Sequence, residues 1–114
     1  MTSQKIATIE RLEMLEEKFG ISLNGVYAEI YGPDDHENWT LKVNGEILAL
    51  NGGELENDFS LKMSAFNSVG DCVETNDLNI SAELFFGIDT FSFYCGWVST
   101  GDIQKVRVFP TKKA

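Results

Sequence analysis

The hydrophobic residues closest to the N-terminus recur at helical spacing. The apolar residues of this stretch lie three or four positions apart and are Ile9, Leu12, Leu15 and Phe19. Glutamates occupy much of its other side. Gly20 follows directly, and glycine is favoured just beyond the C-terminal end of a helix. The pattern predicts an α-helix over about residues 5–19, which either covers the rest of the domain or docks into another chain.

From about residue 21 to about residue 109 the apolar positions alternate with polar ones instead. Phe59 to Ala65 is the clearest stretch, and after a turn at residues 67–71 the alternation resumes from Leu78 to Phe86. Short strands separated by Gly, Asn and Asp turns predict a mainly β fold, a single antiparallel β-sandwich of about seven strands with one N-terminal α-helix. Nothing resembling a linker interrupts the pattern, so residues 1–114 are predicted to form one domain.

Asn44-Gly45 predicts a tight hairpin turn, because this pair is preferred where both central positions need a positive φ. The hairpin strands would be Trp39–Val43 and Glu46–Leu50. Cross-strand neighbours share a face. The turn therefore predicts one apolar patch that consists of Trp39, Leu41, Leu48 and Leu50.

The charge of the chain excludes one class of partner and disfavours another. With a net charge of −9, its surface repels nucleic-acid phosphates and anionic membranes, so we expect neither partner. No apolar run approaches the ~20 residues of a membrane helix. The polar start Met1–Lys5 differs from a secretory signal, which favours a cytoplasmic protein whose Cys72 and Cys95 are free thiols.

Candidate chemistry is sparse. The only histidine, His36, lies in a loop with Asp34, Asp35 and Glu37, where a solvated turn is the ordinary outcome. Without a nucleophile motif, a phosphate-binding loop or a metal-binding motif, the sequence predicts no enzyme and no cofactor. Acidic loops, including Asp34-Asp35 and residues 54–58, could still converge as oxygen ligands for Ca²⁺.

Two functions of different classes fit these observations. The first is a non-enzymatic module that binds a protein partner, or a second copy of itself, through a strand edge, the helix or the acidic surface. The second is a site for a small molecule or a carbohydrate, whose stacking surfaces would come from Trp39, Trp97, Tyr94, Tyr31 and Tyr27. Aromatic residues side by side in a concavity would favour the second function, and a flat exposed face would favour the first.

The run from Phe59 to Asn76 resembles the core of bacterial fibronectin-III-like sandwich modules of the FxLYD type. Those modules have an aromatic strand, then a short polar turn with glycine, then a valine-rich strand. The similarity covers part of the chain only. It implies an immunoglobulin-like β-sandwich used for structure or binding, without catalytic residues.

Overall fold

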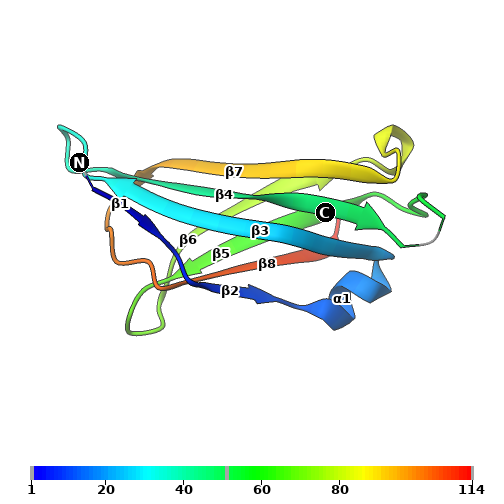
Figure 1. Cartoon of the computed structure of the whole chain (residues 1–114), viewed down its shortest axis with the longest axis horizontal. Helices are drawn as coiled ribbons and strands as arrows, with labels where there is room; N and C mark the ends of the chain where they lie inside the picture. The colour runs from blue at the N-terminus through cyan, green and yellow to red at the C-terminus, as the bar shows by residue number, and fades with distance from the viewer. Residues whose placement is uncertain (1, 51, 114) are drawn as a thin grey trace.

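Eight strands form two facing four-stranded sheets in the part of the chain that the structure describes, residues 2–50 and 52–113 of a computed structural model (Figure 1). In spatial order, the first sheet contains β1 (Thr2–Lys5), β3 (Ile21–Gly32), β4 (Trp39–Ala49) and β7 (Ile88–Val98). The second contains β2 (Thr8–Arg11), β8 (Lys105–Lys112), β5 (Phe59–Phe66) and β6 (Cys72–Ile80). The mainly β, two-sheet prediction is confirmed, but the strands number eight rather than seven.

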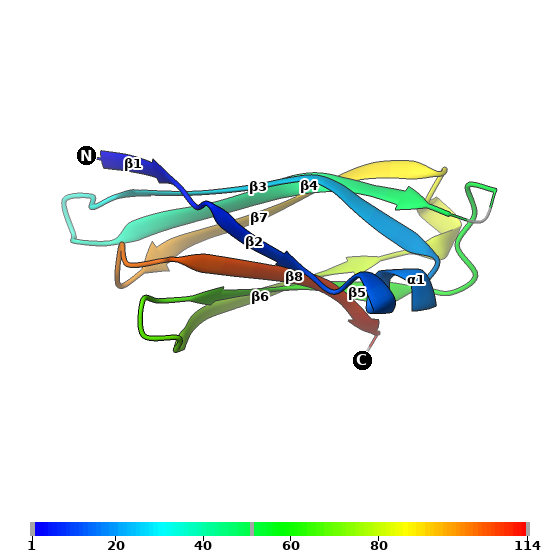
Figure 2. The same ribbon diagram turned by 60° about the horizontal axis from the view of Figure 1, so that its bottom comes forward.

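The predicted helix over residues 5–19 is wrong for most of its length. Only α1 (Glu13–Lys18) is helical, and the residues before it form β1 in the first sheet and β2 in the second. Figure 2 shows the chain passing from one layer to the other between these strands. Ile6 lies at this crossing with 3% of its surface exposed, and its amide donates to the Ala28 carbonyl. Strand pairing at two sheet edges outweighs the modest helical preference of the segment.

The β2 strand also departs from the predicted antiparallel arrangement, because it pairs with β8 in parallel. The other pairings of the two sheets are antiparallel. A parallel neighbour needs a long connection in the chain. Here the whole domain separates Thr8 from its partner Lys105, so no local pattern could indicate the pairing.

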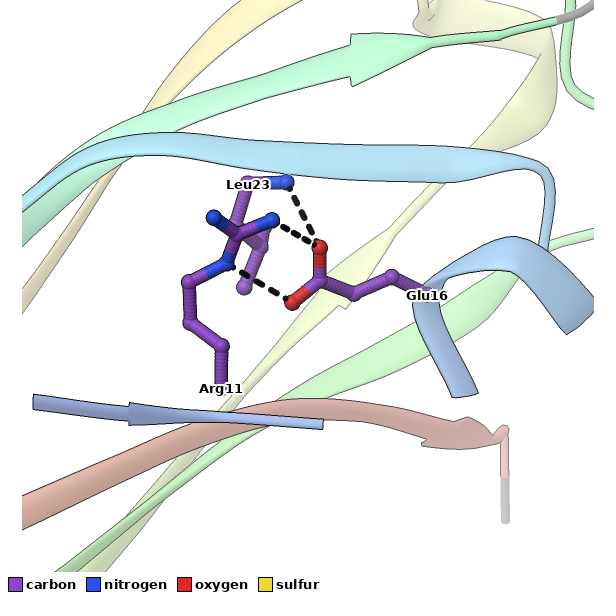
Figure 3. Close-up of polar contacts among 3 residues, drawn as sticks. All are labelled: Arg11, Glu16 and Leu23. Carbon is purple, nitrogen blue, oxygen red and sulfur yellow. Dashed lines mark hydrogen bonds and ion pairs between the residues drawn. The ribbon is translucent and has the colours of Figure 1, made fainter. Parts of the chain in front are cut away.

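The short helix α1 is joined to both sheets by the side chain of Glu16, which is 2% exposed (Figure 3). Arg11 at the end of β2 donates to both carboxylate oxygens of Glu16, over 2.6 and 3.1 Å. The backbone amide of Leu23 in β3 donates to one of them over 3.1 Å. Gly20 follows the helix with φ +73°, as predicted for a residue that terminates a helix.

The predicted hairpin at Asn44-Gly45 is also wrong. β4 runs straight through this pair, with Asn44 opposite Tyr27 of β3 and opposite Ser92 of β7. A strand between two neighbours satisfies its backbone hydrogen bonds on both sides, which a turn would not. Leu41, Val43 and Ile47 therefore point into the core, whereas Leu48 and Leu50 lie on the opposite face from Leu41.

The core lies between the sheets and contains the alternating residues that the sequence indicated. Phe59, Leu61, Met63 and Ala65 of β5 are fully buried, as are Val106 and Val108 of β8. The turn after β5 is also confirmed, because the Gly70 amide donates to the Asn67 carbonyl.

The predicted strand from Leu78 to Phe86 ends early, at Ile80, and a 3-10 helix η1 (Ala82–Leu84) follows it. This change of conformation reverses the expected faces. Phe85 is buried instead, while Leu84 and Phe86 are 75% and 88% exposed.

Candidate functional site

The solvent-facing side of the first sheet carries four tyrosine and tryptophan side chains, which we call the aromatic surface: Tyr27, Tyr31, Tyr94 and Trp97. Tyr27, Glu29 and Tyr31 occupy every second position of β3. They therefore lie on the same face, because strand side chains alternate. Tyr94 pairs with Lys42 of β4, which in turn pairs with Glu29 of β3. Tyr94 is 62% exposed and Trp97 is 81% exposed.

A shift in register near the end of β7 separates Tyr94 from Trp97. Leu41 pairs with Cys95, but Trp39 pairs with Val98, so β7 has one residue more than β4 over this interval. Such a bulge changes the direction in which the following side chains point. Val98 enters the core and the adjacent Trp97 remains in solvent.

Hydrogen bonds connect several side chains of the aromatic surface to their neighbours, and the rings stay accessible to solvent. The Tyr27 hydroxyl donates to Glu29 over 2.7 Å, and this hydrogen bond raises the pKa of Tyr27. The neighbouring Tyr94 hydroxyl raises the pKa of Tyr31. The raised pKa values keep the phenols of Tyr27 and Tyr31 neutral at physiological pH.

The charges around the aromatic surface balance each other. The Lys5 ammonium lies 5.4 Å from the centre of the Tyr27 ring, and β3 and β4 contribute Glu29, Lys42 and Glu46 to the same face. Two lysines and two glutamates make this face locally neutral, although the whole protein carries −9. The excess negative charge therefore lies on other parts of the molecule.

The aromatic surface borders an open sheet edge. Within the described residues, β7 is the last strand of the first sheet and pairs with β4 alone. It forms the upper margin of the molecule in Figure 1. Asp89 is the only charged residue among its eleven, and it contains no proline. An edge strand offers unpaired N–H and C=O groups to another strand, and lysine or proline commonly prevents this.

A second exposed apolar group lies where β7 begins. Ile88 is 54% exposed opposite Leu48, and Leu50 and Phe86 nearby are 51% and 88% exposed. The sequence analysis placed Leu50 and Phe86 in buried faces and so missed this group. The change of conformation around Gly87, which has φ +99°, exposes Phe86, and the only signal for it was the glycine itself.

The structure separates the predicted site residues. Tyr31, Tyr94 and Trp97 share the aromatic surface, but Trp39 is half-buried and packs against the core. Its indole lies so close to Gly101 that a Cβ at Gly101 would be 2.6 Å from the ring. Trp39 is therefore a packing residue.

Asp34 and Asp35 lie in the exposed loop between β3 and β4. One carboxylate oxygen of Asp34 accepts hydrogen bonds from the backbone amides of Asn38 and His36, at 2.9 and 2.8 Å. These amides lower the pKa of Asp34. The carboxylate thus shapes its own loop, which is the usual role of aspartate in turns.

Two hollows lie at the end of the molecule opposite the loop of Asp34, and neither includes an aromatic-surface residue. One, of about 900 Å³, lies between α1, residues 54–58 and the end of β8, and the other, of about 470 Å³, between residues 52–55 and 82–86. Their described lining contains no histidine, cysteine or serine, and its ionisable groups are carboxylates and lysines.

In the part of the chain that the structure describes, no three His, Cys, Asp or Glu side chains lie close enough together to hold a metal ion. Both cysteines are free thiols, Cys72 exposed and Cys95 half-buried. Burial raises the pKa of Cys95. A raised pKa makes this thiol a poor nucleophile.

Within residues 2–50 and 52–113, no helix is long and apolar enough to cross a membrane. Comparisons with protein-family models, curated proteins and solved structures found no match to this chain. The resemblance to fibronectin-III-like modules therefore stays a prediction. The candidate site rests on the geometry of the aromatic surface and of the β7 edge.

Proposed function

We propose that the chain is a non-enzymatic protein-binding module that uses the aromatic surface and the adjacent edge of β7. The observation that carries the proposal is the exposure of Tyr94 and Trp97 on a strand whose outer edge pairs with no other described strand. Tyrosine and tryptophan are enriched at protein interfaces, because they bury a large area and keep a polar group for a hydrogen bond. We place this activity in the cytoplasm, where exposed thiols such as Cys72 stay reduced.

A protein partner fits this surface better than a small molecule. Small-molecule sites are concave and bury most of their ligand. The two hollows described above are lined by neither Tyr94 nor Trp97. Tyr94 and Trp97 instead lie on the outside of a sheet, where a second protein surface would cover both of them. A carbohydrate stacked on the same rings remains the alternative function.

The experiment is an affinity purification from the native host with three forms of the tagged chain. We expect the wild type to retain a protein that the double variant Tyr94→Ala, Trp97→Ala binds at least about tenfold more weakly, because truncated aromatic anchors lose most of their binding energy. Val69→Ala is the matched control. Val69 is 78% exposed, but it lies in the turn between β5 and β6 of the other sheet.

Recovery of the same proteins by all three forms would contradict the proposal. Binding of a soluble polysaccharide by the wild type, lost in the double variant, would favour the carbohydrate alternative. Thermal melts of the purified variants establish that both are folded, which we expect because Tyr94 and Trp97 are mostly in solvent.

A further inference from the structure

The two sheets leave two strand edges open on one side of the molecule, and these edges differ in charge. The opposite side ends in the short strands β1 and β2. On the open side, β6 carries Glu74 and Asp77 among nine residues and directly follows Asp71. β7 carries Asp89 alone among eleven. Charged side chains discourage edge-to-edge pairing, so β6 is protected where β7 is not.

We propose that the β7 edge pairs with the β7 edge of a second copy of this chain, so that two first sheets join into one continuous sheet. The inference rests on the proposed function, since it names the partner of that surface. A two-fold axis perpendicular to the sheet makes such a pairing antiparallel and self-complementary. Both copies then satisfy their outward backbone groups at once.

The regular part of β7 supports one register. From Ile88 to Cys95 the strand pairs with β4 without interruption, before the bulge that precedes Trp97. A two-fold axis centred on Phe91 places Ile88 opposite Tyr94 of the second copy, and Thr90 opposite Ser92. Ile88 and Tyr94 are 54% and 62% exposed in the single chain. Pairs of an aromatic and a β-branched residue stabilise neighbouring strands, and this register forms that pair twice.

Charge favours a second copy over a basic partner at this edge. A basic strand would gain most from a row of acidic residues, and β7 has only Asp89. The surrounding face is neutral, with Lys5 and Lys42 beside Glu29 and Glu46. The net charge of −9 on each copy comes from more distant groups, and salt screens those beyond about 8 Å at 0.15 M.

The test is the mass of the full chain in solution by sedimentation equilibrium. We expect wild type to reach twice its 12.7 kDa mass with rising concentration. Ser92→Asp should raise the dimer dissociation constant at least about tenfold, because the two introduced carboxylates, each opposite Thr90 of the other copy, are diagonal neighbours on one face of the joined strands and repel each other. Thr75→Asp is the matched control. Like Ser92, Thr75 is a small, exposed hydroxyl residue, but it lies in the middle of the other open edge, β6. It should leave the dimer intact.

Charge reversal provides a second, independent variant. Ser92→Lys alone should also weaken the dimer, whereas an equal mixture of Ser92→Lys and Ser92→Asp chains should form a mixed dimer. Thermal melts must show that each variant is folded. Because the two copies repel each other, raising salt from roughly 0.05 to 0.5 M should tighten the wild-type dimer, whereas a complex with a basic partner would weaken.

A wild-type chain that stays monomeric up to about 1 mM, well above ordinary binding constants, would overturn the inference. So would a dimer that Ser92→Asp leaves unchanged, or variants of opposite charge that do not combine. If the chain is monomeric and the aromatic double variant still loses a host protein, the proposed function stands and this inference fails. If neither is observed, both fail.

Discussion

Gly45 shows how one missing side chain determines the path of a strand. A Cβ built at Gly45 would lie 2.6 Å from the ring of Phe91 on the neighbouring strand β7, which is closer than carbon atoms approach. The glycine has no positive φ, so its role is space for a buried ring rather than a turn. The same residue that suggested a hairpin is therefore required by packing.

We expect Gly45→Ala to lower the free energy of unfolding by about 1–3 kcal/mol, because the added methyl group overpacks the contact with Phe91. Gly96→Ala is the control. Its Cβ would be 3.4 Å from Tyr94, an ordinary contact, and its φ is not positive. Urea unfolding of both variants measures the difference, and an unchanged Gly45→Ala would contradict the close packing.

Glu16 is the other residue on which local structure depends. Its buried carboxylate accepts hydrogen bonds from the guanidinium of Arg11 and from the backbone amide of Leu23, and so connects α1 to both β2 and β3. The hydrogen bonds that Arg11 donates to Glu16 raise the pKa of Arg11, so the arginine stays charged. A carboxylate inside a protein is tolerated when it is paired in this way.

Glu16→Ala should cost about 1–3 kcal/mol of unfolding free energy, because it leaves the Leu23 amide and the Arg11 guanidinium without their acceptor. Glu13→Ala, at an exposed position of the same helix, should change stability by less than about 0.5 kcal/mol. Equal effects of the two substitutions in chemical unfolding would mean that the buried contact contributes nothing.

Among the elements, the turn after β5 is linked to the loop that precedes β8 through one carboxylate. Asp102 accepts a hydrogen bond from the Ser68 hydroxyl over 2.7 Å and another from the Ser68 amide. The Ser68 hydroxyl, followed by the Gln104 side chain, lowers the pKa of Asp102. Two loops far apart in sequence are thereby held side by side.

Ser68→Ala should raise the pKa of Asp102 toward its ordinary value near 3.8, as measured by carboxyl-carbon NMR titration. Because the folded pKa of Asp102 is the lower one, its contribution to stability is present above the unfolded pKa and is lost as pH falls through the folded pKa. Melting temperature should therefore depend less on pH below about 4 in Ser68→Ala. Ser99→Ala, on an exposed serine of the same loop region, should leave the titration unchanged.

On the scale of the whole molecule, the N-terminal residues seal one side of the sandwich and leave the other side open. β1 and β2 border β3 and β8, while Ile6 fills the space between the layers. The same arrangement places β6 and β7 at the other side, and the proposed interactions occur at β7.

Deleting residues 1–12 should remove the cooperative thermal transition or lower its midpoint strongly, because the edges of β3 and β8 and the core around Ile6 become exposed. Deleting residues 113–114 should have little effect, since Lys113 contributes an exposed ion pair with Asp58. Circular dichroism melts and size-exclusion chromatography check both forms. A truncated chain that melts like the full one would show that β1 and β2 are not structural.

The sequence by itself determined the features that depend on near neighbours. Alternation in Phe59–Ala65 identified a buried face, because strand side chains change sides at every residue. Gly20 ended a helix, and Asn67–Gly70 formed a turn, through local backbone preferences. Tyr31, Tyr94 and Trp97 were named as candidates by their chemistry alone.

Tertiary structure decided the features that depend on distant partners. Thr2–Lys5 and Thr8–Arg11 became strands because they pair with the edges of β3 and β8. β4 stayed straight because β3 and β7 flank Asn44-Gly45 on both sides. The same distant contacts separated Trp39, packed near Gly101, from Trp97, which is left in solvent by the bulge in β7. Periodicity shows which residues share a face, but only the packed sheets decide which faces and edges remain open.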